Sequence, residues 1–212
     1  MLRLYYNPFS RARIAHWMLE EIEQPYELEL IDFNKGENQT PEFRALNPMG
    51  KLPCLVHDGL VVTEAAAICA YLADHFPEKE LAPSPGDPLR GSYYRWLFFG
   101  AGCIESAILD KMFERPPVRP GSIGYGTYEL TMKVIEEALD PGPYLLGERF
   151  SAADVYVGAS LGWGVMTKAV PRTPVIGRYI DCLEARPAAR RAREKGNAFI
   201  PKVNPAVSNE QP

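Results

Sequence analysis

The chain has 212 residues, of which 46% are apolar and 24% are charged, and its net charge at pH 7 is −4. This composition is typical of a globular protein with room for two modest domains, and it gives no reason to expect nucleic acid or an anionic membrane as a partner. No apolar run is long enough to span a bilayer and no signal peptide opens the chain, so we expect a cytoplasmic protein.

The first third of the chain alternates between short strands and helices. Residues 2–6 and 26–31 have strand character, and a segment with helical spacing, 10–23, separates them. A strand, a helix and a second strand in this order predict a parallel pair joined by a right-handed crossover.

A hairpin and a further helix complete this part of the chain. Residues 52–57 and 60–63 have strand character and are joined by Asp58-Gly59, a strong turn signal, and helical spacing resumes over 64–76. With a short helix or turn at 40–46, the order of elements predicts a thioredoxin-like α/β domain over residues 1–77.

The chain is predicted to be helical beyond a proline-rich linker at 78–88. The expected second domain is all-α and covers residues 89–200, followed by an irregular tail at 201–212. The basic run from Arg186 to Lys195 is typical of a solvated helix face. The expected helices are 89–112, 128–139, 151–167, 175–185 and a last one that begins at Pro187.

Two short segments of the first domain suggest a ligand site. Pro53 lies among apolar residues with strand character and needs a strand edge or a turn. If the bond before it is cis, the backbone of Leu52 faces outward and can pair with an extended peptide; an ordinary trans proline is the alternative. Glu64 either caps the following helix or binds a ligand ammonium group, and the N–H groups of Ala65 and Ala66 would then hold a carboxylate. A γ-glutamyl group carries both charges on one carbon.

Three motifs in this order resemble those of the cytosolic glutathione S-transferases of bacterial type. Residues 47–53, Asn-Pro-Met-Gly-Lys-Leu-Pro, and the helix start at 63–72 are similar to the signatures of the glutathione-binding domain. Residues 147–154 resemble the folding box of the helical domain. There we expect Ser151 and Asp154 to form a capping box with a structural role.

The resemblance implies a metal-free enzyme, active as a homodimer, that conjugates glutathione to small apolar electrophiles in detoxification. It implies a cis bond before Pro53, pairing of Leu52 with the glutathione backbone, and binding of the γ-glutamyl end by Glu64 and Ala65. The family commonly has Ser or Thr at this last position. Loss of that hydroxyl hydrogen bond would cost about 0.5–1.5 kcal/mol of binding.

A hydroxyl group is expected to stabilise the glutathione thiolate, because only the thiolate is a good nucleophile. Family members use tyrosine, serine or cysteine, and no cysteine precedes Cys54. We predict Ser10, with Tyr5 and then Asn7 as alternatives, although Ser10 also suits a helix N-cap. The electrophile is expected beside the aromatic helix 89–112, at a pocket bordered by residues 116–126. Its candidate contacts, which also suit core packing or a dimer interface, are Tyr93, Trp96, Phe99, Met112 and Phe113.

Two rival functions stay open. One is a glutathione-dependent isomerase of the maleylacetoacetate type, which ranks lower because its Ser-Ser-Cys run is absent. The other is a non-catalytic scaffold of the same fold that interacts with other proteins.

Overall fold

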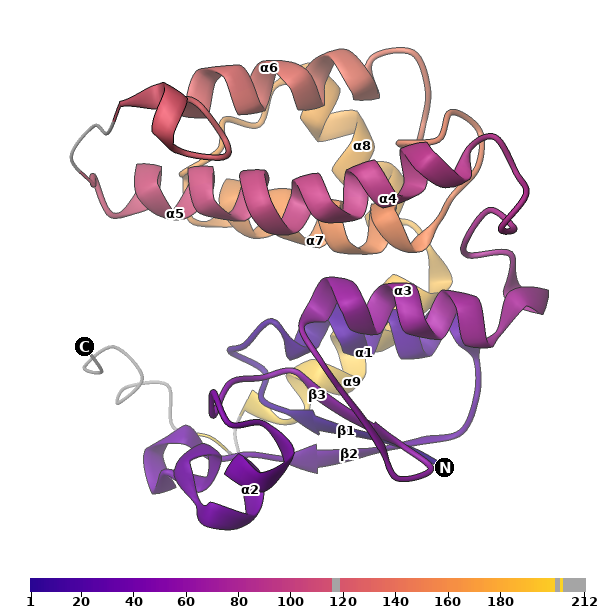
Figure 1. Ribbon diagram of the computed structural model, residues 1–212, viewed down its shortest axis with the longest axis vertical. Coiled ribbons are helices and arrows are strands. Elements are labelled where there is room, and N and C mark those ends of the chain that lie inside the picture. Colours follow the sequence, from indigo (N-terminus) through magenta and orange to yellow (C-terminus); the bar gives the residue numbers. More distant parts are fainter. Residues whose placement is uncertain (116–118, 201–202, 204–212) are drawn as a thin grey trace. The chain divides into compact units, whose positions relative to one another are not determined.

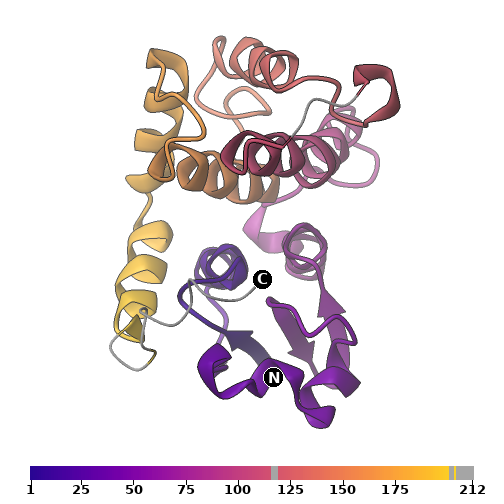
Figure 2. The ribbon, with the colours of Figure 1, turned by 90° about the vertical axis from the view of Figure 1, so that its left-hand side faces the viewer.

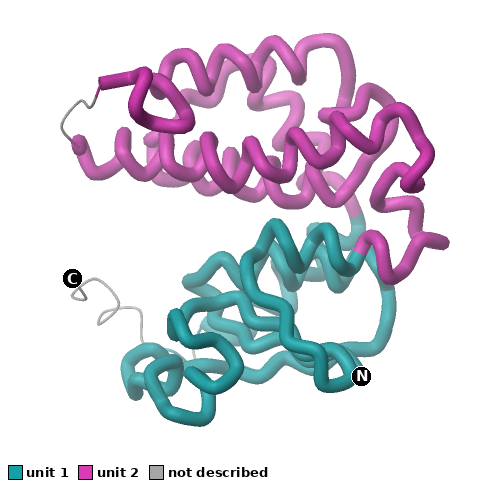
Figure 3. Tube along the Cα trace, in the orientation of Figure 1, with its two compact units in different colours: residues 1–72, 187–212 teal, residues 73–186 magenta. Residues whose placement is uncertain are grey.

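The computed structural model describes residues 1–115, 119–200 and 203, and the chain divides into two compact units (Figure 3). Unit 1 comprises residues 1–72 and 187–212, and unit 2 comprises residues 73–186. The tail predicted at 201–212 lies outside the described residues, apart from Val203. Among the described residues, no helix is long and apolar enough to cross a membrane.

Unit 1 is built on a four-stranded sheet with strand order β2-β1-β3-β4 (Figure 1). β1 pairs parallel with β2 and antiparallel with β3, and β3 and β4 form a hairpin. The predicted crossover, hairpin and thioredoxin-like class are thus confirmed. The strands are β1 (Leu2–Tyr6), β2 (Tyr26–Leu30), β3 (Cys54–His57) and β4 (Leu60–Thr63).

The core of unit 1 follows from the period-two alternation of β1. Leu2, Leu4 and Tyr6 are buried, whereas Arg3 and Tyr5 are half-buried on the opposite face. The buried face of β1 lies against α1, which in turn packs on α9. The helices of this unit are α1 (Ala12–Ile22), α2 (Pro41–Leu46), α9 (Pro187–Asn197) and the start of α3 (Ala65–His75).

The last helix, α9, belongs to unit 1 and not to the helical domain predicted over residues 89–200. Figure 2 shows α9, in yellow, beside α1, in indigo. Glu20 of α1 is 4% exposed, and its carboxylate accepts hydrogen bonds from Arg191 Nε at 2.9 Å and Lys195 Nζ at 2.5 Å. A buried carboxylate is costly unless it is paired. These two cations keep 39% and 53% of their side-chain surface exposed, as expected of a solvated face, but they also anchor α9 to Glu20.

Among the described residues of unit 2 the named elements are all helices, as predicted for the second domain, and residues 144–149 add two isolated bridges. The predicted helix 89–112 is divided by a π-helical segment, Gly100–Ile104. A Cβ at Gly100 would lie 2.8 Å from the ring of Tyr156, so the missing side chain permits close contact between the π-helical segment and α7. The helices are α4 (Arg90–Phe99), α5 (Glu105–Met112), α6 (Tyr128–Leu139), α7 (Ala152–Met166) and α8 (Pro174–Glu184).

The predicted capping box at the start of α7 is confirmed. The backbone N–H of Ser151 donates to Asp154 Oδ2 at 2.9 Å, and the Ser151 hydroxyl donates to the same oxygen at 3.1 Å. The other carboxylate oxygen accepts from the Leu145 N–H and the Tyr179 hydroxyl. Burial raises the pKa of Asp154 to about 6, against the effect of these four donors. The carboxyl group joins α7 to α8 and to the preceding loop, which is a structural role.

Candidate functional site

The strand register brings three predicted site segments to one end of the sheet. Tyr5, near the end of β1, pairs with Cys54 at the start of β3, which pairs in turn with Thr63 at the end of β4. The loop after β1, the residues before β3 and the residues after β4 therefore meet at this end. These segments carry Ser10, Leu52-Pro53 and Glu64-Ala65, respectively.

Leu52 immediately precedes β3, and the Leu52–Pro53 peptide bond is cis, as the resemblance implied. The backbone N–H and C=O of Leu52 hydrogen-bond to no other described residue. The pairing of β3 with β1 begins only at Cys54. A peptide lying along this segment would find one donor and one acceptor on the same residue.

Glu64 joins β4 to α3 and has a φ of +67°, in the left-handed region that disfavours residues other than glycine. Its side chain is exposed. The first helical hydrogen bond of α3 runs from the N–H of Ile68 to the Glu64 carbonyl, at 2.9 Å. The N–H groups of the preceding turn therefore have no partner within the helix. A strained residue with a free carboxylate beside a helix N-terminus can bind an ammonium and a carboxylate side by side.

Ser10 lies two residues before α1 and is half-buried. Its hydroxyl donates to the carbonyl of Asn7 at 2.8 Å and accepts from the N–H of Ala12 at 3.2 Å. Arg11, and not Ser10, is the N-cap residue of α1, but the Ser10 hydroxyl binds the N–H of the first helical residue, Ala12. Because a hydroxyl has a single proton, it must turn away from the Asn7 carbonyl before it can donate to a ligand atom.

The two alternatives to Ser10 differ in how far their polar groups are occupied. The Asn7 amide donates to the Ile31 carbonyl at 2.8 Å and accepts from the Phe9 N–H at 2.9 Å, and the residue is 2% exposed. Tyr5 is half-buried with its ring edge-on to Phe43, 5.4 Å between centroids. The Asn7 side chain is committed to shaping the turn, and the Tyr5 hydroxyl interacts with the Arg3 side chain.

The role of Asn47 was not predicted. Its side chain donates to the Lys51 carbonyl at 2.8 Å and accepts from the Met49 N–H at 3.1 Å, so it holds the loop that leads to Pro53. It is 4% exposed. The Asn-Pro dipeptide signals a turn, but the two bonds become visible only once the loop is folded.

Burial raises the pKa of the Cys54 thiol to about 11 and also raises that of Cys69. A buried neutral thiol is a poor nucleophile at neutral pH. These two thiols of unit 1 are therefore structural, and any thiolate chemistry at the sheet end would use a ligand's sulfur.

In unit 2, the aromatic side chains predicted to contact an electrophile lie in different environments. Tyr93 and Trp96 are buried, with 0% and 3% exposed, so they offer a ligand almost no surface. Phe99 and Met112 are half-buried, and Phe113 is 62% exposed. Core packing therefore accounts for Tyr93 and Trp96.

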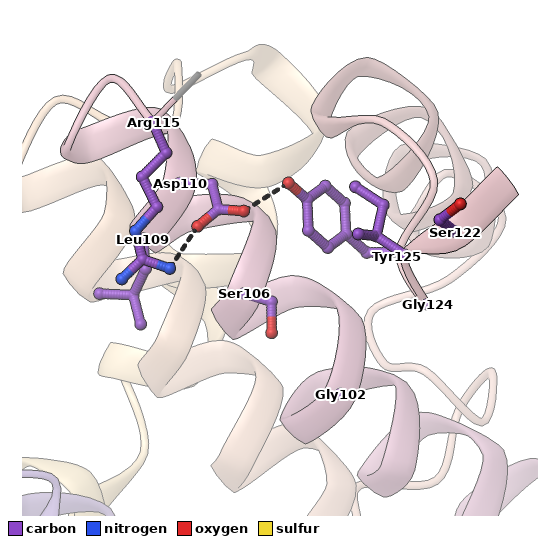
Figure 4. Close-up of a pocket in the computed structure, with 9 residues that line it drawn as sticks. Gly102, Ser106, Leu109, Asp110, Arg115, Ser122, Gly124 and Tyr125 are labelled. Carbon is purple, nitrogen blue, oxygen red and sulfur yellow. Dashed lines mark hydrogen bonds and ion pairs between the residues drawn. The ribbon is translucent and has the colours of Figure 1, made fainter. Parts of the chain in front are cut away.

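A cavity of about 440 Å³ lies between α5 and residues 122–125 of unit 2 (Figure 4). Asp110 lies in its wall and accepts from Arg115 at 2.9 Å and from the Tyr125 hydroxyl at 2.6 Å. Residues 122–125 thus line a cavity, but none of the predicted electrophile contacts does, so the expectation that residues 116–126 border the electrophile pocket stays a prediction; residues 116–118 lie outside the described residues.

The fold defines a class: a thioredoxin-like domain with a four-stranded sheet, followed by a helical domain. Residues 1–74 match the glutathione S-transferase N-terminal domain. Glutathione S-transferase GstA of Escherichia coli O157:H7 is 27% identical over 169 residues, 79% of this chain and 84% of that protein.

Solved structures agree with this match. A glutathione transferase from Methylococcus capsulatus is 32% identical, with a TM-score of 0.79 over 93% of this chain and 100% of that one. A glutathione transferase homologue from Sulfitobacter, solved with bound glutathione, is 28% identical, with a TM-score of 0.74 over 92% of this chain and 98% of that one. The chain therefore belongs to the glutathione S-transferase family.

Proposed function

We propose that this chain binds glutathione at the sheet end of unit 1 and conjugates it, as the thiolate, to small apolar electrophiles. The observation that carries the proposal is the backbone of Leu52, whose N–H and C=O have no partner among the described residues. They adjoin the sheet end that also bears Ser10 and Glu64. Family membership and the glutathione bound to the Sulfitobacter homologue support the same ligand.

Each part of glutathione has a proposed partner in unit 1. The cysteinyl backbone pairs with the N–H and C=O of Leu52, and Pro53 fixes the direction of that segment. The γ-glutamyl ammonium binds the Glu64 carboxylate, and the γ-glutamyl carboxylate accepts a hydrogen bond from the Ala65 N–H. Ala65 cannot add a hydroxyl hydrogen bond, which weakens binding by about 0.5–1.5 kcal/mol relative to a serine.

Ser10 is the proposed thiolate stabiliser. A free thiol has a pKa of about 8.5, and lowering it by about two units requires roughly 2.7 kcal/mol of differential stabilisation. A hydroxyl that donates to sulfur at the start of α1, helped by the helix dipole, is of the right kind for this task. Tyr5 is the alternative donor. With an aryl halide, the thiolate sulfur forms a bond to the ring carbon and the halide leaves with the bonding pair.

The electrophile contacts proposed in unit 2 are Phe99, Met112 and Phe113, the members of the predicted set with exposed surface. We also propose a cytoplasmic homodimer that acts in detoxification. Family membership supports these assignments.

Calorimetric titration with reduced glutathione and conjugation to 1-chloro-2,4-dinitrobenzene test the proposal. Binding together with turnover is the expected result. Binding without turnover of this or other electrophiles would favour the scaffold function, and no binding would refute both.

The Ser10→Ala substitution tests the mechanism. If Ser10 lowers the thiol pKa by about two units, turnover at pH 6.5 falls by about 10- to 100-fold, the pH profile moves upward, and glutathione affinity changes little. Ser10→Thr keeps a hydroxyl and is the matched control. An unchanged pH profile in Ser10→Ala, with a shift in Tyr5→Phe, would transfer the role to Tyr5.

A further inference from the structure

The turn that carries Ser10 is contacted by a side chain of the helix that follows it. Arg13 lies in the first turn of α1 and is half-buried, and Pro8, two residues before Ser10, is buried. Arg13 Nη1 donates to the Pro8 carbonyl at 3.3 Å, and the Arg13 backbone N–H donates to the Ser10 carbonyl, also at 3.3 Å. Arg13 therefore holds the turn at two points.

The same guanidinium group reaches the end of α9. Arg13 Nη2 donates to Asn197 Oδ1 at 3.1 Å. The chain lies close to β1 here: the ring of Phe199, just beyond α9, is 5.8 Å from that of Tyr6 between centroids, and a Cβ at Gly196 would overlap the Tyr6 hydroxyl. Since ion pairs also anchor α9 on α1, Arg13 joins the turn to an element that is held in place.

The partners of the Arg13 guanidinium are neutral. Among the described residues they are one carbonyl and one amide oxygen, and Arg13 forms no ion pair. An arginine presents its donors in a rigid planar fork, so it can bridge two acceptors in fixed directions, whereas a lysine has one compact ammonium group on a flexible stem. The shape of the guanidinium, and not only its charge, therefore fixes the turn to α9.

A fixed turn matters for the chemistry proposed at Ser10. Asn7 holds the start of the turn through its hydrogen bonds to the Ile31 carbonyl and the Phe9 N–H, and Arg13 holds the part that follows. A hydroxyl stabilises a thiolate only where the distance and the angle of the hydrogen bond are right, and a displacement of about 1 Å can cost up to about 100-fold in rate.

We propose that Arg13 is a positioning residue for Ser10: by bridging the turn and α9, it keeps the Ser10 hydroxyl where a glutathione thiolate can accept its hydrogen bond. This inference rests on the proposed function. Arg13 forms no hydrogen bond or ion pair with the residues proposed to bind the glutathione backbone and the γ-glutamyl end. Its loss should therefore affect thiolate formation more than glutathione affinity.

The thiol pKa of bound glutathione, followed by the ultraviolet absorbance of the thiolate against pH, tests the proposal. Arg13→Gln should raise this pKa by about one unit and lower turnover at pH 6.5 about tenfold, while glutathione affinity measured by calorimetry changes less than about threefold. Asn197→Ala removes the contact with α9 and should raise the pKa by about half a unit. The control is Arg178→Gln, since Arg178 is an exposed cation paired with Asp140 in unit 2.

Two further variants separate positioning from a direct effect of the charge. Arg13→Lys keeps the charge but not the fork, so it should behave like Arg13→Gln. In the Ser10→Ala background, Arg13→Gln should add no further shift, because a residue that acts through Ser10 then has no hydroxyl to position. A wild-type thiol pKa in Arg13→Lys, additive shifts in the double variant, or an equal loss of glutathione affinity and turnover in Arg13→Gln would overturn the proposal.

Amide hydrogen exchange of the ligand-free chain tests the positioning without glutathione. The N–H groups of Phe9 and Ser10 donate to the side chain and the carbonyl of Asn7, respectively. They should exchange roughly tenfold faster in Arg13→Gln than in the wild type or in Arg178→Gln, because the turn opens more often. Unchanged exchange would overturn the positioning role. Faster exchange in a chain that binds no glutathione would support the structural role of Arg13 and refute the proposed function alone.

Discussion

Glu64→Gly separates the cost of the backbone conformation at the proposed site from the function of the side chain. Glu64 has a φ of +67°, and its carboxylate forms no hydrogen bond or ion pair with another described residue. The left-handed conformation costs a residue with a side chain about 1–2 kcal/mol, and glycine avoids this cost. Since glycine also has more conformational freedom to lose on folding, about 0.5–1 kcal/mol, we expect a net gain in stability of about 0.5–1 kcal/mol.

The same substitution should weaken glutathione binding. A hydrogen bond between a carboxylate and an ammonium contributes about 1.5–3 kcal/mol, so its loss lowers affinity by roughly 10- to 150-fold. Glu64→Gln is the matched control: it keeps the strained backbone and one acceptor oxygen but loses the charge. It should show unchanged stability and an intermediate affinity.

Urea unfolding measures the first effect and calorimetric titration with glutathione the second. A variant that is more stable and binds less well means that the strain at Glu64 is retained for ligand binding. Unchanged affinity in Glu64→Gly would remove the carboxylate from the ligand site. A loss of stability would refute the assignment of backbone strain.

Two further predictions concern stability. Burial lowers the pKa of His16 to about 4, despite the nearby carboxylate of Glu20. Between pH 6.5 and 4 the unfolded chain therefore binds more protons than the folded one. The free energy of unfolding then decreases by up to about 3 kcal/mol as the pH is lowered through this window. Unfolding followed against pH should show a flatter dependence in His16→Gln but not in His75→Gln, a control at an exposed histidine; equal slopes in His16→Gln and the wild type would contradict this. Gly100→Ala places a methyl 2.8 Å from a packed tyrosine ring, so it should lower the melting temperature and cost about 1–2 kcal/mol even after the gain in helix propensity; a more stable variant would show that the contact between the π-helical segment and α7 is loose.

Much of unit 1 could be predicted because its signals are local. Alternation over five residues defines β1, the Asp58-Gly59 turn defines the hairpin, and the three-residue spacing of Ser151 and Asp154 defines a capping box in unit 2. The motif around Pro53 also located the candidate site, since its resemblance to a family pattern needs no coordinates.

Other features depend on partners far away in the sequence. The basic run from Arg186 to Lys195 does not indicate that Lys195 binds Glu20, 175 residues earlier. Helix periodicity predicts which face is polar but not which residue that face contacts. The aromatic stripe of α4 likewise gives no sign that Tyr93 is buried and Phe98 exposed.

By itself, the sequence determined the strand order along the chain, the family motifs and the residue types able to bind glutathione. The tertiary structure decided that α9 packs on the first domain, that the Ser10 hydroxyl already donates to the Asn7 carbonyl, and that Glu64 adopts a strained backbone. The physical reason is that local patterns fix backbone preferences over a few residues. The partners of a charge, a hydroxyl or an aromatic ring, by contrast, are set by segments that meet only when the chain folds.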